Sequence, residues 1–180
     1  MKIRFSFLLL LAFAANVHSQ DVTTRVEKNQ FKINVLFPGF VYEHGFSEKN
    51  TLYSEVSLGF GYRKNGYYDE STWSFYPIIN EQFRHYYNLE KRAGKGKRTA
   101  YNSGNFLALN AVCNFKSIST NDDYGEYVPS FTIAPIWGFQ RTYKGKLNLE
   151  VHLGAGVNFD KFNTEFVPVA NFTLGWVIGK

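Results

Sequence analysis

Hydrophobic and polar residues alternate along much of this chain, and the clearest case is the stretch from Leu147 to Asp160. Its odd positions carry only Leu, Val, Ala and Phe, whereas its even positions carry Asn, Glu, His, Gly and Asp. Successive side chains of a β-strand point to opposite faces of the sheet. The stretch is therefore predicted to form a strand with one apolar face and one polar face.

The same period of two recurs in seven further segments, which predicts eight strands in all. These segments cover residues 31–37, 40–46, 52–63, a stretch that begins at 73, 107–116, 130–140 and 166–179. In the stretch that begins at Trp73, the adjacent Ile78 and Ile79 and the acidic Glu81 break the alternation. A β-bulge is therefore predicted near residues 79–82.

Turn and loop signals separate the predicted strands. Short turns are predicted at Pro38-Gly39, Ser47–Asn50 and Lys144–Lys146. Longer polar loops are predicted at 64–71, 117–126 and 160–164, and a basic connector that contains glycine covers 91–97. Because short turns join neighbouring strands in opposite directions, the predicted sheet is antiparallel with up-and-down order.

The first nineteen residues are predicted to be a secretory signal peptide and not part of the fold. Lys2 and Arg4 precede an apolar run, and small residues follow it, so cleavage is expected between Ser19 and Gln20. A short transmembrane anchor is the alternative, but about eleven apolar residues are too few to cross ~30 Å of hydrocarbon as a helix. Residues 20–30 are polar and are predicted to be a periplasmic arm.

Composition and charge narrow the class of protein further. Aromatic residues make up 18% of the chain, which favours a β protein, and the single Cys113 excludes an internal disulfide. Loss of Lys2 and Arg4 with the signal peptide lowers the formal charge from +5 by two to +3, which is too small to suggest nucleic acid binding. Beyond the signal peptide no apolar run is long enough for a membrane helix, so a membrane location would require a barrel.

Eight such strands could close with the apolar face inward, as in a soluble lipocalin-like carrier, or outward, as in a membrane barrel. The interior of an eight-stranded barrel is only wide enough for packed side chains. Here the apolar face is bulky and aromatic, whereas the polar face is rich in Gly, Ser, Thr, Ala and Asn. We therefore expect an all-β fold, an eight-stranded antiparallel up-and-down transmembrane β-barrel over residues 31–180.

Several charged residues fall on the predicted inner face, and both signs are present: Lys32, Glu43, Glu55, Arg63, Arg84, Lys116, Glu150 and His152. Unpaired charges are costly in a narrow interior, so these residues are expected to form a polar network that fills the lumen. A narrow pore lined by the same residues is the alternative. A lipid-modifying barrel enzyme is a further alternative, because Glu150 and His152 share one face and could serve a lumen-facing Ser57 or Ser130.

Aromatic residues are predicted to mark the two membrane interfaces, with Tyr67, Tyr68 and Trp73 outside and Tyr86, Tyr87, Tyr143 and Trp176 on the periplasmic side. The basic residues of 91–98 lack the spacing of a phosphate loop. They are expected to be a solvated connector or to contact anionic lipid head groups. No metal or cofactor site is expected, because no second His or Cys lies at ligand spacing.

A signal peptide, eight such strands and the segment Glu81-Gln82-Phe83-Arg84-His85-Tyr86-Tyr87 together resemble small outer-membrane β-barrels of Gram-negative bacteria. The chain resembles OmpA/OmpX-type barrels and families of unknown function in which Glu, Arg and Tyr-Tyr recur near the fourth strand. Such barrels usually end in an aromatic residue, whereas this chain ends in Ile178-Gly179-Lys180.

The resemblance implies a location in the bacterial outer membrane, with outer-membrane lipid, lipopolysaccharide and the barrel-assembly machinery as partners. The expected role is structural or in surface interaction, without catalysis. A partner outside the cell could contact the loops 64–71 and 117–126.

Overall fold

The computed structural model describes residues 23–64, 71–119 and 128–180, with the backbone alone at Arg63, Lys64, Ser71, Thr72, Ile118 and Ser119. The signal peptide predicted over 1–19 lies outside the described residues. The strands are β1 (Asn29–Asn34), β2 (Gly39–Gly45), β3 (Asn50–Lys64), β4 (Ser71–Tyr86), β5 (Asn105–Asn114), β6 (Ile118–Ser119), β7 (Ser130–Thr142), β8 (Leu147–Asp160) and β9 (Thr164–Gly179). The helical segments are α2 (Leu89–Ala93) and the 3-10 turn η1 (Lys144–Lys146).

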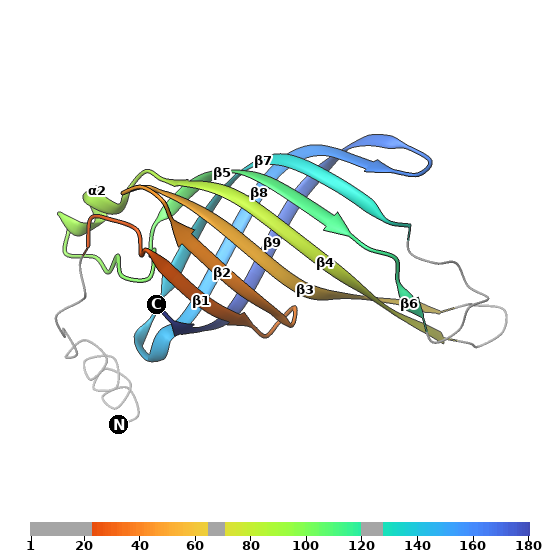
Figure 1. Ribbon diagram of the computed structural model, residues 1–180, viewed down its shortest axis with the longest axis horizontal. Helices are drawn as coiled ribbons and strands as arrows, with labels where there is room; N and C mark the ends of the chain where they lie inside the picture. Colours follow the sequence, from red (N-terminus) through yellow and green to blue (C-terminus); the bar gives the residue numbers. More distant parts are fainter. Residues whose placement is uncertain (1–22, 65–70, 120–127) are drawn as a thin grey trace, which may run out of the picture.

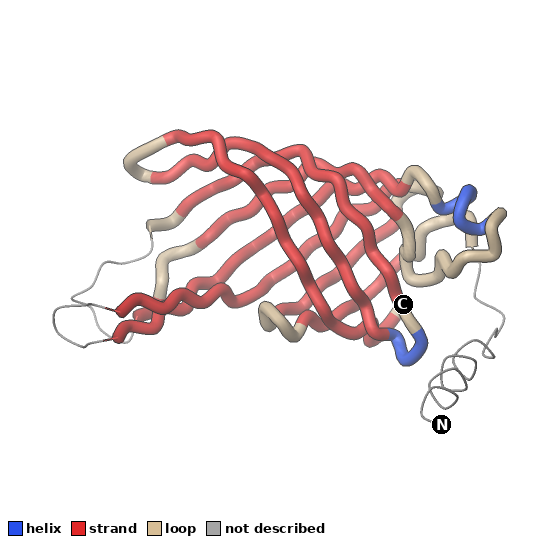
Figure 2. Tube along the Cα trace, turned by 180° about the vertical axis from the view of Figure 1, so that it is seen from behind, coloured by secondary structure: helices blue, strands red, loops and turns tan. Residues whose placement is uncertain are grey.

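Eight antiparallel strands form one ring-like sheet, which confirms the predicted number of main strands (Figures 1 and 2). The order is β3-β2-β1-β9-β8-β7-β5-β4, and β4 pairs with β3 again to close the ring. The short strand β6 lies inside the segment predicted to be the loop 117–126. Its residues Ile118 and Ser119 pair with Phe75 and Ser74 of β4. That prediction was wrong for these two residues, because pairing with β4 outweighs their polar surroundings in the sequence.

The strands of the ring differ greatly in length. β3 and β4 form fifteen residue pairs, from Asn50 with His85 to Lys64 with Ser71. By contrast, β1 and β2 have six and seven residues, and β1 pairs with β9 through only four residue pairs. We call the end of the ring with α2, η1 and the C-terminus the terminal end and the opposite end the far end (Figure 1). β3 and β9 therefore extend much further toward the far end than the β1–β2 hairpin between them.

The two faces of the sheet differ in the way the alternation predicts. Large apolar side chains point outward and are exposed on every long strand, for example Leu58, Phe83, Leu109, Trp137 and Phe172. The inner face carries polar side chains and small residues. No helix in the described part of the chain is long and apolar enough to cross a membrane.

The β-bulge predicted near residues 79–82 is absent from the pairing of β4 with its neighbours. The register of β4 runs without a shift from Ile79, paired with Val56, to Gln82, paired with Tyr53. Glu81 simply faces outward, and its Oε2 accepts a hydrogen bond of 2.7 Å from Ser54 Oγ on β3. The bulge prediction was wrong because this cross-strand pair keeps a polar residue on the apolar face. A register shift occurs instead between Phe31 and Lys32, where β1 meets β9.

A small apolar core closes the terminal end of the ring. Leu89 of α2, an element that the sequence did not predict, packs there with inward-facing Tyr86, Phe106, Ala134 and Ile136. Since apolar burial stabilises the fold at roughly 25 cal/mol per Å², this cluster fixes α2 across the end of the sheet. The segment after α2 then returns to β5 beside the end of the ring (Figures 1 and 2).

Candidate functional site

Six of the eight charged residues predicted on the inner face lie inside the ring with at most 4% of their surface exposed: Lys32, Glu43, Glu55, Arg84, Glu150 and His152. They come from β1, β2, β3, β4 and β8, so the closed pairing of the strands brings them together. Lys116 lies two residues beyond the end of β5 and is exposed. The side chain of Arg63 lies outside the described part of the structure. We call the six buried residues and their bonded neighbours the inner network.

Arg84 is the centre of the inner network. Its Nη1 donates a hydrogen bond of 3.0 Å to Glu150 Oε2, and its Nη2 donates a second to Glu150 Oε1, so the two groups form a two-bonded ion pair. Its guanidinium carbon lies 3.7 Å from the centre of the Tyr53 ring and 4.3 Å from that of Phe106. A guanidinium suits such a site, because its fork fits a carboxylate and its flat faces stack on aromatic rings.

A second ion pair lies beside the first. Lys32 Nζ lies 3.3 Å from Glu43 Oε2 and 3.7 Å from Glu150 Oε2, and it donates a hydrogen bond of 2.8 Å to Gln140 Oε1. Glu43 Oε1 accepts two further hydrogen bonds of 2.8 Å, from Thr51 Oγ1 and Tyr86 OH. Both carboxylates therefore have several partners, as buried charges require.

Glu55 is held in another way, by neutral donors alone. Its carboxylate accepts hydrogen bonds of 2.7 Å from Asn34 Nδ2, 3.0 Å from Tyr53 OH and 3.2 Å from Asn80 Nδ2. The described inner network thus contains three carboxylates and two permanent cations, which are mutually bonded or capped. Such a network occupies much of the interior of the ring with bonded side chains.

Tyr86 was predicted at the periplasmic interface, and this prediction was wrong. Its side chain is fully buried and donates to Glu43, because Tyr86 and Tyr87 are neighbours on one strand and must point to opposite faces. Of the other predicted interface aromatics, Trp73, Tyr87, Tyr143 and Trp176 are exposed. Tyr67 and Tyr68 lie outside the described residues. The sequence analysis also did not identify Gln140 and Tyr53 as members of the inner network. The alternation of their strands places both side chains inward but does not indicate that they contact charged residues.

The arrangement around His152 does not form a hydrolytic triad. Its Nδ1 lies 3.7 Å from Glu150 Oε1 and has no hydrogen-bond partner within residues 23–64, 71–119 and 128–180, while both carboxylate oxygens of Glu150 accept hydrogen bonds from Arg84. Neither Ser57 nor Ser130 bonds to His152 among the described residues, and Ser130 Oγ instead accepts a hydrogen bond from Asn114. The same residues contain no group of three or more His, Cys, Asp or Glu that could hold a metal ion.

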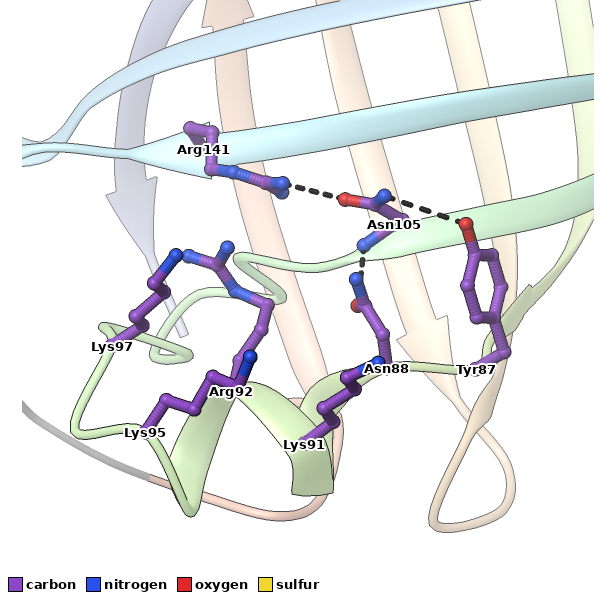
Figure 3. A pocket seen from close by; sticks show the side chains of 8 residues that line it. All are labelled: Tyr87, Asn88, Lys91, Arg92, Lys95, Lys97, Asn105 and Arg141. Carbon is purple, nitrogen blue, oxygen red and sulfur yellow. Dashed lines mark hydrogen bonds between the residues drawn. The ribbon is translucent and has the colours of Figure 1, made fainter.

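A second polar site lies on the outside of the ring at the terminal end, where a pocket of about 460 Å³ is lined by five cations (Figure 3). They belong to α2, the segment after it and the end of β7: Lys91, Arg92, Lys95, Lys97 and Arg141. The described lining of this pocket contains no carboxylate. We call it the basic pocket, and it gathers four of the five basic residues that the sequence placed in the connector.

Two arginines of the basic pocket are held in place by backbone oxygens. Arg141 donates to the carbonyl oxygens of Gly104 and Gln140, both at 2.7 Å, and Arg92 Nη2 donates to that of Arg98 at 2.9 Å. Burial lowers the pKa of Arg92, because its charged form loses contact with water. An anion in the pocket would restore favourable interactions to this guanidinium.

Comparisons of the chain with protein-family models, with curated proteins and with solved structures find no match.

Proposed function

We propose that the chain is an eight-stranded barrel of the bacterial outer membrane whose lumen is closed by the inner network, with a structural or surface-interaction role and no catalysis. The observation that carries this proposal is the inversion of the usual burial pattern. Large apolar side chains are exposed around the outside of the ring, while Lys32, Arg84 and Glu150 are buried within it. Water would surround such an exterior only at a high cost in free energy, whereas lipid suits it.

Strand dimensions support the same proposal. The fourteen residues of β8, at ~3.3 Å each and tilted ~40°, project roughly 35 Å, which exceeds an apolar band of ~25 Å. Exposed Tyr87 and Tyr143 at the terminal end would lie at the periplasmic interface. The basic pocket lies at the same end, where phosphate head groups of anionic lipid would be within its reach.

The inner network supports a closed lumen. If the network opened, buried charges such as those of Glu43 and Arg84 would lose the hydrogen bonds and ion pairs that stabilise them. The network is therefore expected to persist in the membrane. Lipopolysaccharide would surround the far end, and an external partner would contact the loops 64–71 and 117–126. Insertion would require the barrel-assembly machinery, with Trp176 as the aromatic residue nearest the C-terminus.

Fractionation tests the proposed location. The full chain should leave bacterial membranes only with detergent, and release by osmotic shock would show a soluble periplasmic protein instead. Planar-bilayer recording on the purified protein tests the closed lumen, because sizeable open-channel currents would contradict it.

A charge on the outer face tests lipid contact directly. Leu109 is 52% exposed near the middle of β5, so Leu109→Arg should lower the free energy of unfolding in lipid vesicles by about 2–4 kcal/mol. Phe162→Arg is the matched control, because Phe162 is 77% exposed in the turn between β8 and β9. Equal effects of the two substitutions would show that the outer face does not contact hydrocarbon.

A further inference from the structure

The wall of the ring is incomplete toward the far end. β1 stops pairing with β9 at Asn34, although Val35 N still donates to Leu174 O, and β2 stops pairing with β3 at Ser57. Beyond these positions, residues 59–64 of β3 and 164–173 of β9 have no strand partner among the described residues on the side of the short hairpin. We call this region the wall gap. It lies beyond the β1–β2 turn, toward the far end of the ring (Figure 1).

The turn at the base of the wall gap is apolar, unlike an ordinary loop. It reads Val35-Leu36-Phe37-Pro38, and the first three side chains are 53%, 49% and 37% exposed. The seven residues of β2 project only about 18 Å, at ~3.3 Å each and ~40° tilt, which is less than an apolar band of ~25 Å. In a membrane the turn would therefore end within the hydrocarbon, and the wall gap would face acyl chains.

A cavity of about 230 Å³ lies inside the ring behind this turn. Phe37 lines it from the turn, Ser57 and Glu55 from β3, and Ala170 and Thr173 from β9, so it touches both edges of the wall gap. Ala170 belongs to the exposed face of β9, which places the mouth of the cavity at that edge. The inner network closes the cavity toward the terminal end through Glu55, Asn80 and His152.

Two buried side chains that line this cavity have polar atoms without a hydrogen bond among the described residues. Asn110 is fully buried, and neither its Nδ2 nor its Oδ1 has a hydrogen-bond partner in the described part of the chain. His152 Nδ1 is buried and likewise has no hydrogen-bond partner among the described residues, its nearest charged neighbour being Glu150 Oε1 at 3.7 Å. Buried polar atoms are normally bonded, so this site offers both donors and acceptors to a guest molecule. No Lys or Arg lines the cavity, and Glu55 is already capped by three donors, so the site suits an uncharged polar group and not a phosphate.

We propose that this cavity binds the uncharged, hydrogen-bonding head of a single-chain amphiphile, such as a monoacylglycerol, whose acyl chain leaves sideways through the wall gap into the membrane. Asn110 and His152 bond the head, and Phe37 with Val169 contacts the start of the chain. The volume equals roughly eight water molecules at ~30 Å³ each, which fits a glycerol ester head. This inference rests on the proposed membrane location.

Binding of monoolein to the purified full chain in maltoside detergent, measured by native mass spectrometry and by equilibrium titration, tests the site. Asn110→Leu keeps the branching of the side chain at Cγ and removes both polar atoms, and it should weaken binding at least tenfold. Val112→Phe should abolish binding by filling the cavity. The matched controls are Asn114→Leu, on the inner face of β5 beyond the cavity lining, and Leu109→Phe, on its outer face. Both controls should bind as the wild type does.

Specificity gives a second readout. Monoolein should bind more tightly than lysophosphatidylcholine or oleate, and glycerol alone should not bind measurably. The proposal is overturned if folded protein, identified by its heat-dependent gel mobility, takes up no monoolein, or if Asn110→Leu and Val112→Phe bind as the controls do. Preference for lysophosphatidylcholine or oleate would also overturn it. A cavity that holds only water would take up no monoolein.

The lateral route has its own test. In a Cys113→Ser background, a fluorophore attached at Leu36→Cys should be quenched by spin labels on lipid acyl chains, whereas one at Phe162→Cys should be quenched by aqueous iodide. Quenching of both positions by iodide alone, in protein that has inserted into vesicles, would overturn the lateral route while the proposed membrane location stands. Failure of the protein to insert would overturn both.

Discussion

The ion pair between Arg84 and Glu150 allows a quantitative test of the inner network. Arg84→Met removes the guanidinium that holds Glu150 at 3.0 Å. Among the described residues, the permanent cation that remains beside Glu150 is Lys32, at 3.7 Å, and Lys32 already serves Glu43. Three buried carboxylates would face one permanent cation, so Arg84→Met should lower the free energy of unfolding by about 4–5 kcal/mol, the upper part of the range for a broken buried pair.

Glu150→Leu should cost less, about 3 kcal/mol, because Lys32 and Arg84 would then face Glu43 and Glu55 in equal number. The double variant removes one charge of each sign and leaves the pair of Lys32 with Glu43 intact. It should therefore lie within about 1–2 kcal/mol of the wild type, since apolar replacement of a complete buried pair is often nearly neutral.

Urea titration of the protein in lipid vesicles, followed by gel mobility and tryptophan fluorescence, measures these three free energies. The double-mutant cycle gives the coupling between the two residues directly. Additive effects of the two substitutions, or single effects below about 1 kcal/mol, would refute the view that this pair holds the lumen closed.

Three further sets of substitutions test neighbouring features. Replacement of Lys91, Lys95 and Lys97 by Gln should remove about 1 kcal/mol of attraction per residue for vesicles with anionic lipid, leaving binding to neutral vesicles unaffected and weakening the salt dependence of binding, because Arg92 and Arg141 remain. Gly156→Ala should destabilise the fold by about 1–3 kcal/mol, because an added Cβ would lie 2.5 Å from that of Ala134, whereas Gly61→Ala, which meets nothing within 4 Å, should be tolerated in the same urea titration. Ser54→Ala should lower stability in lipid by about 1–3 kcal/mol, since Glu81 loses its partner on the apolar face, and an unchanged midpoint would contradict this.

Strand positions could be predicted from the sequence because alternation is a local property. The stretch from Leu147 to Asp160 was predicted as one strand and forms β8 with the same bounds. Glu81 interrupts the apolar face of β4 and led to the wrong prediction of a bulge, whereas Ser54 interrupts the apolar face of β3 without changing the strand predicted over 52–63. They lie opposite each other and are bonded, so each exception is the reason for the other.

Local sequence patterns could not predict which residues of the inner network bond to each other. Alternation placed Arg84 and Glu150 inward, but their meeting depends on the closure of the ring and on the register of strands far apart in sequence. Tyr86 was misplaced because it was read together with Tyr87 as one aromatic pair. The basic pocket depends on Arg141, which joins the connector cations only because β7 ends beside α2 (Figure 3).

The short contact between β1 and β9 also has a consequence for how the ring forms. It joins the two ends of the chain through four residue pairs, whereas the hairpin contact of β3 with β4 has fifteen. Contacts between residues distant in sequence form slowly, because loop closure must come before the contact stabilises the chain. We therefore expect this seam to close last during folding, and its amide hydrogens to exchange first in the native protein. The short β1–β2 hairpin leaves the wall gap and also limits the contact between β1 and β9. Pairing of β1 with β9 would therefore be the step that limits the rate of barrel assembly.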